Sequence, residues 1–397
     1  MPTTRAARRA AAYVAVREAN EQASFLCHLP LEVQASILFW LPLAHDIALA
    51  GLTCHSLRDA AKLALKARPF SSEVVRLSAA PDQYRAPFRN SNHGVECAVA
   101  LPDGRFITGT DDGVIQVWRD GACVQTIEDV AEEIGAAHCE LVRGLAALPD
   151  GRLLSCSNDD TTKLWTSDGK LERTFEEDGL VGSIAVAPDG VHFVVGLYNG
   201  EIKVYHIDGT LLHTFESTDR DEVTGADDRG HHEFVNGVAV TRDGQHIFSV
   251  GDHVVNVWSV ASQSLVCTCH GHAGEVWAVA AMPDGQRIIS GGSDCTVRVW
   301  LLDGTPENIF IHHTQVVNAL VALPDNQHAL SCSGMLRRLP SDNTIKLFNV
   351  DTGAVLRTFR HHLGPVNALA LLPDGLRFVS GAADDTACVV YHGLAPQ

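Results

Sequence analysis

One short motif recurs seven times along this chain, and its spacing constrains the fold more than any other feature. Each copy is a Pro-Asp-Gly turn, or a close variant of it, followed by an aromatic residue. The turn aspartates lie 39 to 54 residues apart and are Asp103, Asp150, Asp189, Asp243, Asp284, Asp325 and Asp374. The aromatic residues that follow them are Trp118, Trp165, Tyr205, Trp258, Trp300, Phe348 and Tyr391. A period of about 40 to 50 residues is typical of the blades of a β-propeller, so we expect seven blades.

The fifth unit indicates what each blade contains. Its pattern predicts strands over 276–281, 287–290, 296–301 and about 308–312, with tight turns between them. These segments are apolar on both faces, as expected where blades stack on blades. Few residues follow Tyr391, so the seventh unit lacks a fourth strand of its own. The apolar run over residues 74–77 can supply that strand, which would close the ring and remove an exposed sheet edge.

The repeat resembles the WD repeat over about residues 90–397. The features that carry the resemblance are clearest in the fifth unit: Gly271-His272, Ser290, Asp294 and Val299-Trp300. The resemblance implies a mainly β fold, a seven-bladed propeller, that binds partners through loops at one face. In this family that face is usually formed by the loops between fourth and first strands and between second and third strands, since loops vary while packed strands do not.

Part of the repeated pattern mimics a catalytic Ser-His-Asp triad beside an aromatic residue: His272, Ser290, Asp294 and Trp300. The same set recurs as His138, Ser155, Asp159 and Trp165, and in part as His313, Ser331 and Asp342. A catalytic site is not repeated around a ring, so we expect no enzyme activity. In WD repeats these residues form a buried hydrogen-bond relay, and the resemblance implies that structural role here. The third unit has Glu177 and Asn199 in the His and Asp positions, which predicts the least rigid blade.

Composition narrows the choice of partner and compartment. The net charge of −18 disfavours nucleic-acid binding, because a phosphate backbone requires a basic face. No run reaches the roughly 18 apolar residues of a membrane span, and we expect no secretory signal. The 11 cysteines are odd in number and lack paired spacing, which indicates a reduced compartment, the cytoplasm or the nucleus. We expect no cofactor and no metal, and interpret one tempting cluster as packing and relay residues: Cys267, Cys269, His270 and His272.

The residues before the repeats have helical periodicity. They open on Leu29-Pro30-x-Glu32 and continue with Ile37-Leu38, Leu41-Pro42, Asp46-Ile47 and Leu52-x-Cys54. This segment resembles an F-box. The resemblance implies a surface for a Skp-type adaptor made by Leu29, Pro30, Ile37, Leu38, Leu41, Pro42 and Leu52. The alternative is a helical cap packed on the propeller, which Leu57 supports because the F-box family usually has Trp there.

These patterns divide the chain into four parts. We expect an N-terminal helical or flexible segment at 1–24, an F-box-like helical module at 25–65 and a linker at 66–72. The propeller would then occupy 73–397, with 73–79 as the closing strand of the last blade. The first 22 residues are rich in Ala and Arg and fit either an ordinary helix or a mitochondrial transit peptide.

In WD propellers the residue seven positions before each turn aspartate points toward the central channel on the partner-binding face. These channel-mouth positions here are Glu96, Arg143, Gly182, Asn236, Trp277, Asn318 and Asn367. Close to them should lie Asp111, Asn158, Tyr198, Gly251, Ser293, Ser341 and Ala383. Trp and Arg are typical binding hot spots, and Asn can bind the backbone of an extended peptide. The alternative is that Trp277 packs inward and the asparagines satisfy loop backbone.

An insertion between the second and third strands of the sixth unit carries Arg337 and Arg338. Both could join Arg143 around a phosphate or an acidic motif, or they could belong to a solvated loop. Receptors of this architecture that bind phosphorylated degrons present several Arg at the channel-mouth positions, whereas only Arg143 occupies one here.

Two functions follow from the sequence. In the first, the chain is a substrate receptor of an SCF-type cullin–RING ubiquitin ligase: the F-box module binds a Skp-type adaptor, and the propeller face binds the target protein or peptide. In the second, the chain is a WD-repeat interaction scaffold with no link to ubiquitin.

Overall fold

The computed structural model describes residues 75–78, 94–119, 122–128, 136–216, 231, 234–335 and 342–394. The chain divides into two units, Met1–Glu73 and Val74–Gln397. The predicted segment 1–24, the F-box-like module 25–65 and the linker 66–72 lie in the first unit, outside the described residues. Within the described ranges, no helix combines the length and hydropathy needed to cross a membrane.

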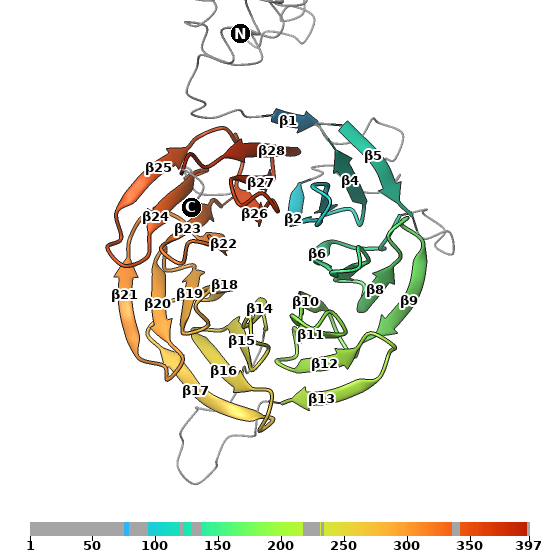
Figure 1. The fold of residues 1–397 in the computed structure, drawn as a ribbon, viewed down its shortest axis with the longest axis horizontal. Helices are drawn as coiled ribbons and strands as arrows, with labels where there is room; N and C mark the ends of the chain where they lie inside the picture. The colour runs from blue at the N-terminus through green and yellow to red at the C-terminus, as the bar shows by residue number, and fades with distance from the viewer. Residues whose placement is uncertain are drawn as a thin grey trace, which may run out of the picture. The chain divides into compact units, whose positions relative to one another are not determined.

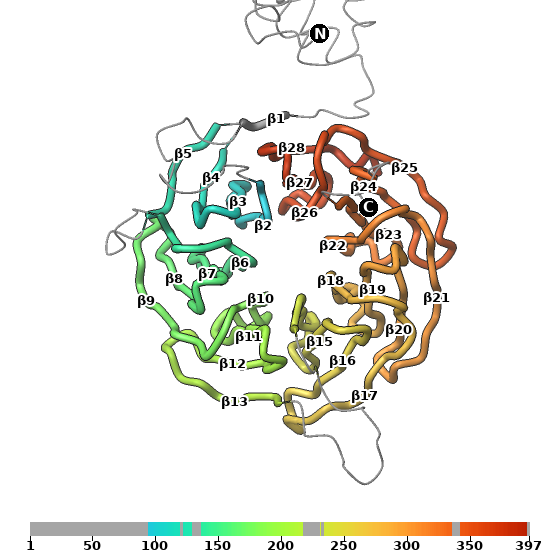
Figure 2. Tube along the Cα trace, turned by 180° about the vertical axis from the view of Figure 1, so that it is seen from behind, coloured from blue at the N-terminus to red at the C-terminus, as the bar shows by residue number. Residues whose placement is uncertain are grey.

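Seven four-stranded antiparallel sheets surround a central opening (Figure 1). The second unit is therefore a seven-bladed β-propeller, and Figure 2 shows the same ring from behind. In blades 1 to 6 the strands follow chain order from the centre to the rim.

The first three blades contain twelve consecutive strands. Blade 1 consists of β2 (Val95–Ala100), β3 (Phe106–Thr110), β4 (Ile115–Arg119) and β5 (Ala122–Ile127). Blade 2 consists of β6 (Val142–Ala147), β7 (Leu153–Ser157), β8 (Thr161–Trp165) and β9 (Leu171–Glu176). Blade 3 consists of β10 (Val181–Val186), β11 (His192–Leu197), β12 (Ile202–His206) and β13 (Leu211–Phe215).

The next three blades repeat this arrangement. Blade 4 consists of β14 (Gly237–Val240), β15 (His246–Gly251), β16 (Val254–Ser259) and β17 (Ser264–His270). Blade 5 consists of β18 (Val276–Ala281), β19 (Arg287–Gly292), β20 (Val297–Leu301) and β21 (Pro306–Phe310). Blade 6 consists of β22 (Val317–Ala322), β23 (His328–Ser333), β24 (Ile345–Asn349) and β25 (Val355–Phe359).

Blade 7 joins the two ends of the described chain. It consists of β26 (Val366–Leu371), β27 (Arg377–Ala382), β28 (Thr386–Tyr391) and, at the rim, β1 (Val75–Ser78). The strand β1 pairs antiparallel with β28 from Val75 opposite Val389 to Ser78 opposite Thr386. This is the place that the sequence analysis gave to residues 73–79, and the pairing covers the edge of β28 that would otherwise be open.

The hydrophobic core lies between neighbouring blades. At the junction of blades 7 and 1, Phe106 and Trp118 pack with Leu372 and Val379 in one buried cluster. Middle strands such as β7 are buried along their whole length, whereas the rim strand β9 leaves much of its surface exposed. Burial on both faces explains why these strands show no alternation of polar and apolar residues.

Two sequence predictions on strand positions were wrong. The fourth strand of the fifth unit is Pro306–Phe310 rather than 308–312, because Gly304 N and Thr305 O close a tight turn on Leu301 and the new strand begins directly after it. In the seventh unit the aromatic partner was expected at Tyr391. Strand register instead places Val390 opposite Phe378, as Trp300 lies opposite Ile288. A shift of one residue puts Tyr391 on the other face of its strand.

Candidate partner-binding face and the buried relays beneath it

The relay in blade 5 is a continuous line of hydrogen bonds. The Trp300 indole Nε1 donates to Ser290 Oγ at 2.8 Å, and the same oxygen lies 2.8 Å from His272 Nε2. The other ring nitrogen of His272 lies 2.9 Å from Asp294 Oδ2, which also accepts the backbone N–H of Ala273. The loop before β18 is thereby tied to the turn between β19 and β20 and to the aromatic residue of β20.

Blade 2 has the same hydrogen-bond geometry with closely similar distances. His138 Nε2 lies 2.7 Å from Ser155 Oγ and His138 Nδ1 lies 2.8 Å from Asp159, while Trp165 donates to Ser155 at 2.8 Å. Ser155 and Trp165 are fully buried, so a substrate cannot reach the serine. Burial alone would raise the pKa of Asp159, but the hydrogen bond and charge of His138 and the Thr161 hydroxyl lower it to about 2.

The sequence analysis found the relay in three units and missed two partial copies. In blade 4, His231 Nε2 lies 2.7 Å from Ser249 Oγ, to which Trp258 donates at 2.8 Å. In blade 7, His362 contacts Ser380 at 2.8 Å and Asp384 at 3.3 Å. The signal that could have found them is the interval from His to Ser, which is 18 residues in blades 4, 5, 6 and 7 and 17 in blade 2.

Blade 3 replaces the relay with a buried ion pair. Glu177 Oε2 accepts hydrogen bonds from Lys203 Nζ at 3.1 Å and from the Tyr205 hydroxyl at 3.0 Å. Burial raises the pKa of Glu177, although Lys203 and Tyr205 act in the opposite direction. The predicted lower rigidity of this blade remains a prediction, but the reason given for it was incomplete, because Glu177 has its own donors on β12.

The predicted channel-mouth residues share a structural cause for their orientation. The register of the innermost strand shifts around Glu96, Arg143, Gly182, Trp277, Asn318 and Asn367, which are the extra residues of six β-bulges. In blade 4, Asn236 directly precedes β14 and its N–H bonds to Val250 O. A bulge removes one residue from the ladder and redirects its side chain, so the same position is freed in blade after blade.

One arc of the channel mouth is polar and linked from blade to blade. Asn318 Nδ2 donates to the Asn367 side chain at 3.3 Å, and Asn367 Nδ2 donates to Glu96 Oε1 at 3.1 Å. Asn318 also donates to Gly334 O and Val366 O, and Asn236 donates to Val276 O. The asparagines therefore satisfy loop backbone in part, as the alternative interpretation expected, and Asn318, Asn367 and Glu96 form one connected group.

The facing arc is aromatic. Tyr198 packs edge-on against Phe234 at 5.0 Å, and the Arg143 guanidinium lies over the Tyr198 ring at 5.4 Å while its Nε donates to Asn158. Trp277 is half-buried, and Phe234 keeps 40% of its surface exposed. The sequence analysis did not propose Phe234, although it stands only two positions before Asn236. Arg337, Arg338 and Ser341 lie outside the described residues. The backbone N–H of Gly334 donates to the carbonyl of Val316, which precedes β22.

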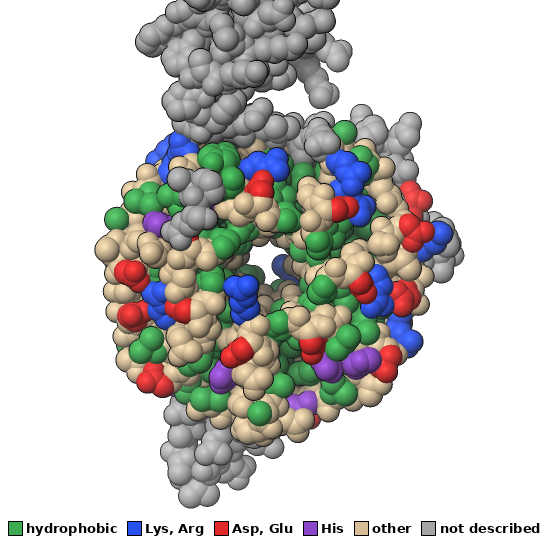
Figure 3. All heavy atoms as spheres, viewed as in Figure 1, with side chains coloured by type: hydrophobic (Ala, Val, Ile, Leu, Met, Phe, Trp, Pro, Cys, Tyr) green, Lys and Arg blue, Asp and Glu red, His purple; other side chains and the backbone are tan. Residues whose placement is uncertain are grey.

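Glu96 is the charged residue of the polar arc, and its pKa is shifted. Burial raises its pKa to about 6, with Arg143 acting in the opposite direction and Asp111 in the same one. Figure 3 shows one face of the ring, where side chains of both charges are scattered around the central opening. Among the described residues on that face, the basic side chains form no continuous surface of the kind that a phosphate backbone requires.

Comparison with known families decides the classification. The family described as WD domain, G-beta repeat, matches residues 86–119, 122–166, 209–259, 263–300, 304–349 and 353–390. The chain belongs to the WD-repeat family. All these WD-repeat matches lie in the second unit. The segment between the second and third match contains β10 to β12, which nevertheless form a regular blade with β13.

Individual relatives of this WD-repeat protein are similar over parts of their length. Cell division cycle 20.1, cofactor of APC complex, of Arabidopsis thaliana is 30% identical over 203 residues, covering 48% of this chain and 40% of the relative. Anaphase-promoting complex subunit cdc20 of Dictyostelium discoideum is 27% identical over 48% of this chain and 36% of its own. Eukaryotic translation initiation factor 3 subunit I of Aspergillus niger is 39% identical over 18% of this chain and 21% of its own. The chain thus spans less than half the length of these relatives, whose names are those of a cofactor and of complex subunits.

Proposed function

We propose that this WD-repeat protein is a substrate receptor of an SCF-type ubiquitin ligase. The propeller would hold a protein partner at the channel mouth, and residues 25–65 would bind a Skp-type adaptor. The chain itself would do no chemistry: it would raise the concentration of the target near a ubiquitin-carrying complex. Such a complex belongs in the cytoplasm or the nucleus.

The observation that carries the partner-binding half is the two-sided channel mouth. An aromatic arc of Tyr198, Phe234 and Trp277 faces a polar arc of Asn318, Asn367 and Glu96. Beside them, Arg143 donates a hydrogen bond to the Asn158 side chain, and its guanidinium lies over the Tyr198 ring. Exposed aromatic and Arg side chains are the residue types that dominate binding energy. Amide and carboxylate groups can pair with the backbone of an extended segment. A segment with apolar side chains on one edge and a hydrogen-bonding backbone on the other fits this arrangement.

The adaptor-binding half depends on the sequence pattern of residues 29–52. Relatives that are named as an APC-complex cofactor and an Anaphase-promoting complex subunit support assembly of a propeller of this kind into a larger complex. The second candidate function, an interaction scaffold without a ubiquitin link, keeps the channel mouth and discards the adaptor. What separates the two candidates is adaptor binding alone.

The test is co-purification of the full chain with a Skp-type adaptor. We expect a one-to-one complex that is lost when Leu29→Ala and Leu41→Ala are combined. The matched control is Arg143→Ala with Trp277→Ala, which changes the channel mouth and should leave adaptor binding intact. A wild-type chain that is folded but does not bind the adaptor, or a double leucine variant that still binds, would exclude the ligase receptor and leave the scaffold.

A further inference from the structure

Blade 7 departs from blades 2 and 5 at three positions, two on the paired strands β27 and β28 and one in the loop before β26. Opposite the relay serine, blades 2, 5 and 6 have Lys163, Arg298 and Lys346, whereas blade 7 has Cys388 opposite Ser380. The relay aromatic is replaced by Val390, as shown above. Before the relay histidine, blades 2 and 5 have Ala137 and Gly271, whereas blade 7 has a second histidine, His361.

Blade 6 shows what a second histidine does when the other two positions are ordinary. There His312 stacks on Phe310 at 5.3 Å and lies 4.9 Å from Phe348, and its Nε2 bonds to Gly353 O. Lys346 donates to the carbonyl of His312. The ring is thus held among aromatic residues and beside a cation, an environment that does not suit a metal ion.

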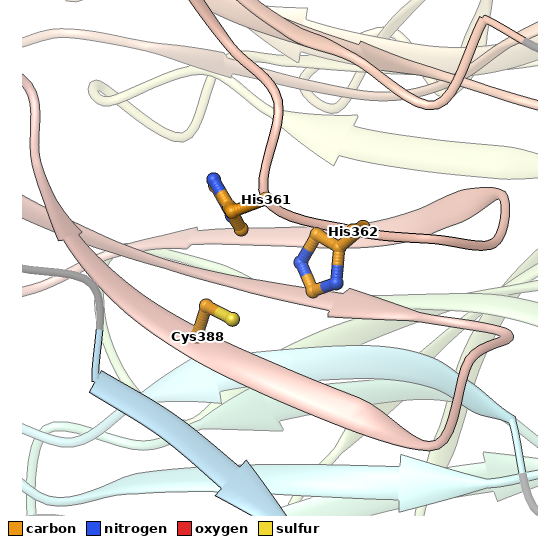
Figure 4. A group of neighbouring side chains, drawn as sticks. All are labelled: His361, His362 and Cys388. Carbon is orange, nitrogen blue, oxygen red and sulfur yellow. The ribbon is translucent and has the colours of Figure 1, made fainter. Parts of the chain in front are cut away.

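In blade 7 the second histidine turns toward the relay serine instead. His361 Nε2 lies 3.0 Å from Ser380 Oγ, the same oxygen that His362 Nε2 reaches at 2.8 Å. One ring nitrogen of each histidine and the Cys388 sulfur all lie within 4.8 Å of one another. Figure 4 shows the Cys388 thiol on β28 pointing toward the ring of His362, which comes from the loop before β26.

These three atoms are close to the geometry of a metal centre. Bonds of about 2.0 Å from Zn²⁺ to nitrogen and 2.3 Å to sulfur place ligand atoms of a tetrahedral site about 3.3–3.6 Å apart. Side-chain shifts of roughly an ångström would therefore bring the three atoms onto one ion. Two imidazoles and a thiolate favour zinc and similar borderline metals over Mg²⁺ or Ca²⁺, which prefer oxygen.

The surroundings also resemble those of a ligating histidine. Cys388 is fully buried and His362 nearly so. His362 Nδ1 lies 3.3 Å from the Asp384 carboxylate and 3.0 Å from the Thr386 hydroxyl. A carboxylate that accepts a hydrogen bond from the Nδ1–H group fixes the tautomer whose Nε2 lone pair can bind a metal. The relay thus orients one ligand before any ion arrives.

We propose that His361, His362 and Cys388 form a Zn²⁺ site inside blade 7. The ion would tie the loop before β26 to β28, the strand that closes the ring by pairing with β1. The sequence analysis expected no metal and interpreted Cys267, Cys269, His270 and His272 as packing and relay residues. It did not consider Cys388, which the fold places close to the adjacent His361 and His362. The competing explanation is that His361 only replaces the missing indole as the hydrogen-bond donor to Ser380. This proposal is independent of the proposed partner and adaptor.

The test is metal titration of the chelator-treated full chain. Co²⁺ should give a thiolate-to-metal charge-transfer band at one equivalent per chain, and Zn²⁺ should displace it and raise the melting temperature. Cys388→Ser should abolish the band. The matched control is Cys269→Ser in blade 4, which removes another buried thiol and should leave the band unchanged. His361→Ala changes a less buried ligand and should weaken binding if Cys388→Ser fails to fold.

A second pair of variants separates metal binding from damage to the relay. Asp384→Asn should weaken Zn²⁺ binding by about 10- to 100-fold, as expected for the partner of a ligating histidine. Asp294→Asn makes the same change in the blade 5 relay and should leave Zn²⁺ affinity unaltered. The proposal is overturned if the wild-type chain binds no more Co²⁺ or Zn²⁺ than Cys388→Ser, or if Cys269→Ser alone removes the thiolate band.

Discussion

The buried relays and the channel mouth lie at the same end of the blades. The relay residues recur from blade to blade, whereas the channel-mouth residues differ. His-Ser-Asp relays recur with contacts near 2.8 Å in blades 2 and 5 and with small changes in blades 6 and 7. The channel-mouth position instead holds Glu, Arg, Gly, Asn or Trp from one blade to the next. The relay satisfies polar groups that are buried inside the blades that contain it, and this need is the same from one such blade to the next. No shared structural role fixes the residue type at the channel-mouth positions, so the side chains there can differ to suit a partner.

The largest effect that would sharpen this comparison is expected in blade 3. Lys203→Met should leave the buried Glu177 carboxylate without its cation and cost about 3–5 kcal/mol of stability in urea denaturation. Combining it with Glu177→Gln should recover most of the loss, because no buried charge then remains. If Lys203→Met alone were as stable as wild type, the ion pair would not stabilise blade 3 as a relay stabilises the blades that contain one.

A smaller loss is expected from breaking the relay of blade 5. Ser290→Ala removes the oxygen shared by His272 and Trp300, and leaving such buried groups unpaired costs about 1–3 kcal/mol. The matched change Ser293→Ala, in the same blade, removes one hydrogen bond from a half-buried hydroxyl near the mouth to Glu275 O, and should cost less, about 0.5–1 kcal/mol. Equal losses in the two variants would erase the distinction between relay and mouth.

The smallest effects are opposite responses to pH. The pKa of Asp159 falls from 3.8 to about 2 on folding, so its stabilising contribution is present above 3.8 and is lost as pH drops toward 2. The pKa of Glu96 rises from 4.5 to about 6. The folded state therefore binds the extra proton between these values, and stability should decrease as pH rises through that window.

Variants assign each slope to its residue. Asp159→Asn should flatten the acid limb of the pH–stability curve, and Glu96→Gln should flatten the segment between about 4.5 and 6. Denaturation midpoints measured across pH would check both. A Glu96→Gln curve that is parallel to wild type over that segment would show that Glu96 is not desolvated at the mouth.

Much of this comparison could be predicted from the sequence because the repeat is local. The Pro-Asp-Gly turns and the spacing to the aromatic residues indicated seven blades, and the channel-mouth positions coincide with bulges of the innermost strands. The errors arose where one residue of register matters: Val390, not Tyr391, takes the relay position, and β21 begins at Pro306.

What the sequence could not give was the side-chain network. Glu177 was interpreted as a lost histidine, since its donors Lys203 and Tyr205 lie on a different strand. Phe234 and Tyr198 meet only once blades 3 and 4 are side by side. The cluster of His361, His362 and Cys388 likewise depends on the register of β27 and β28, which places Cys388 opposite Ser380.

The central claim is that the channel mouth, and not the buried relay, binds the partner. The most direct test is to compare partner capture by a variant of the mouth and a variant of the relay. The full chain, Arg143→Ala/Trp277→Ala and Ser290→Ala would each be cross-linked to bound proteins and the enriched partners quantified by mass spectrometry, with melting temperatures measured in parallel. The account predicts that Arg143→Ala/Trp277→Ala loses its partners while its melting temperature is unchanged. Ser290→Ala should have a lower melting temperature but should keep its partners at temperatures where it is still folded. Partners retained in full by the mouth variant would contradict the assignment of this face as the binding site.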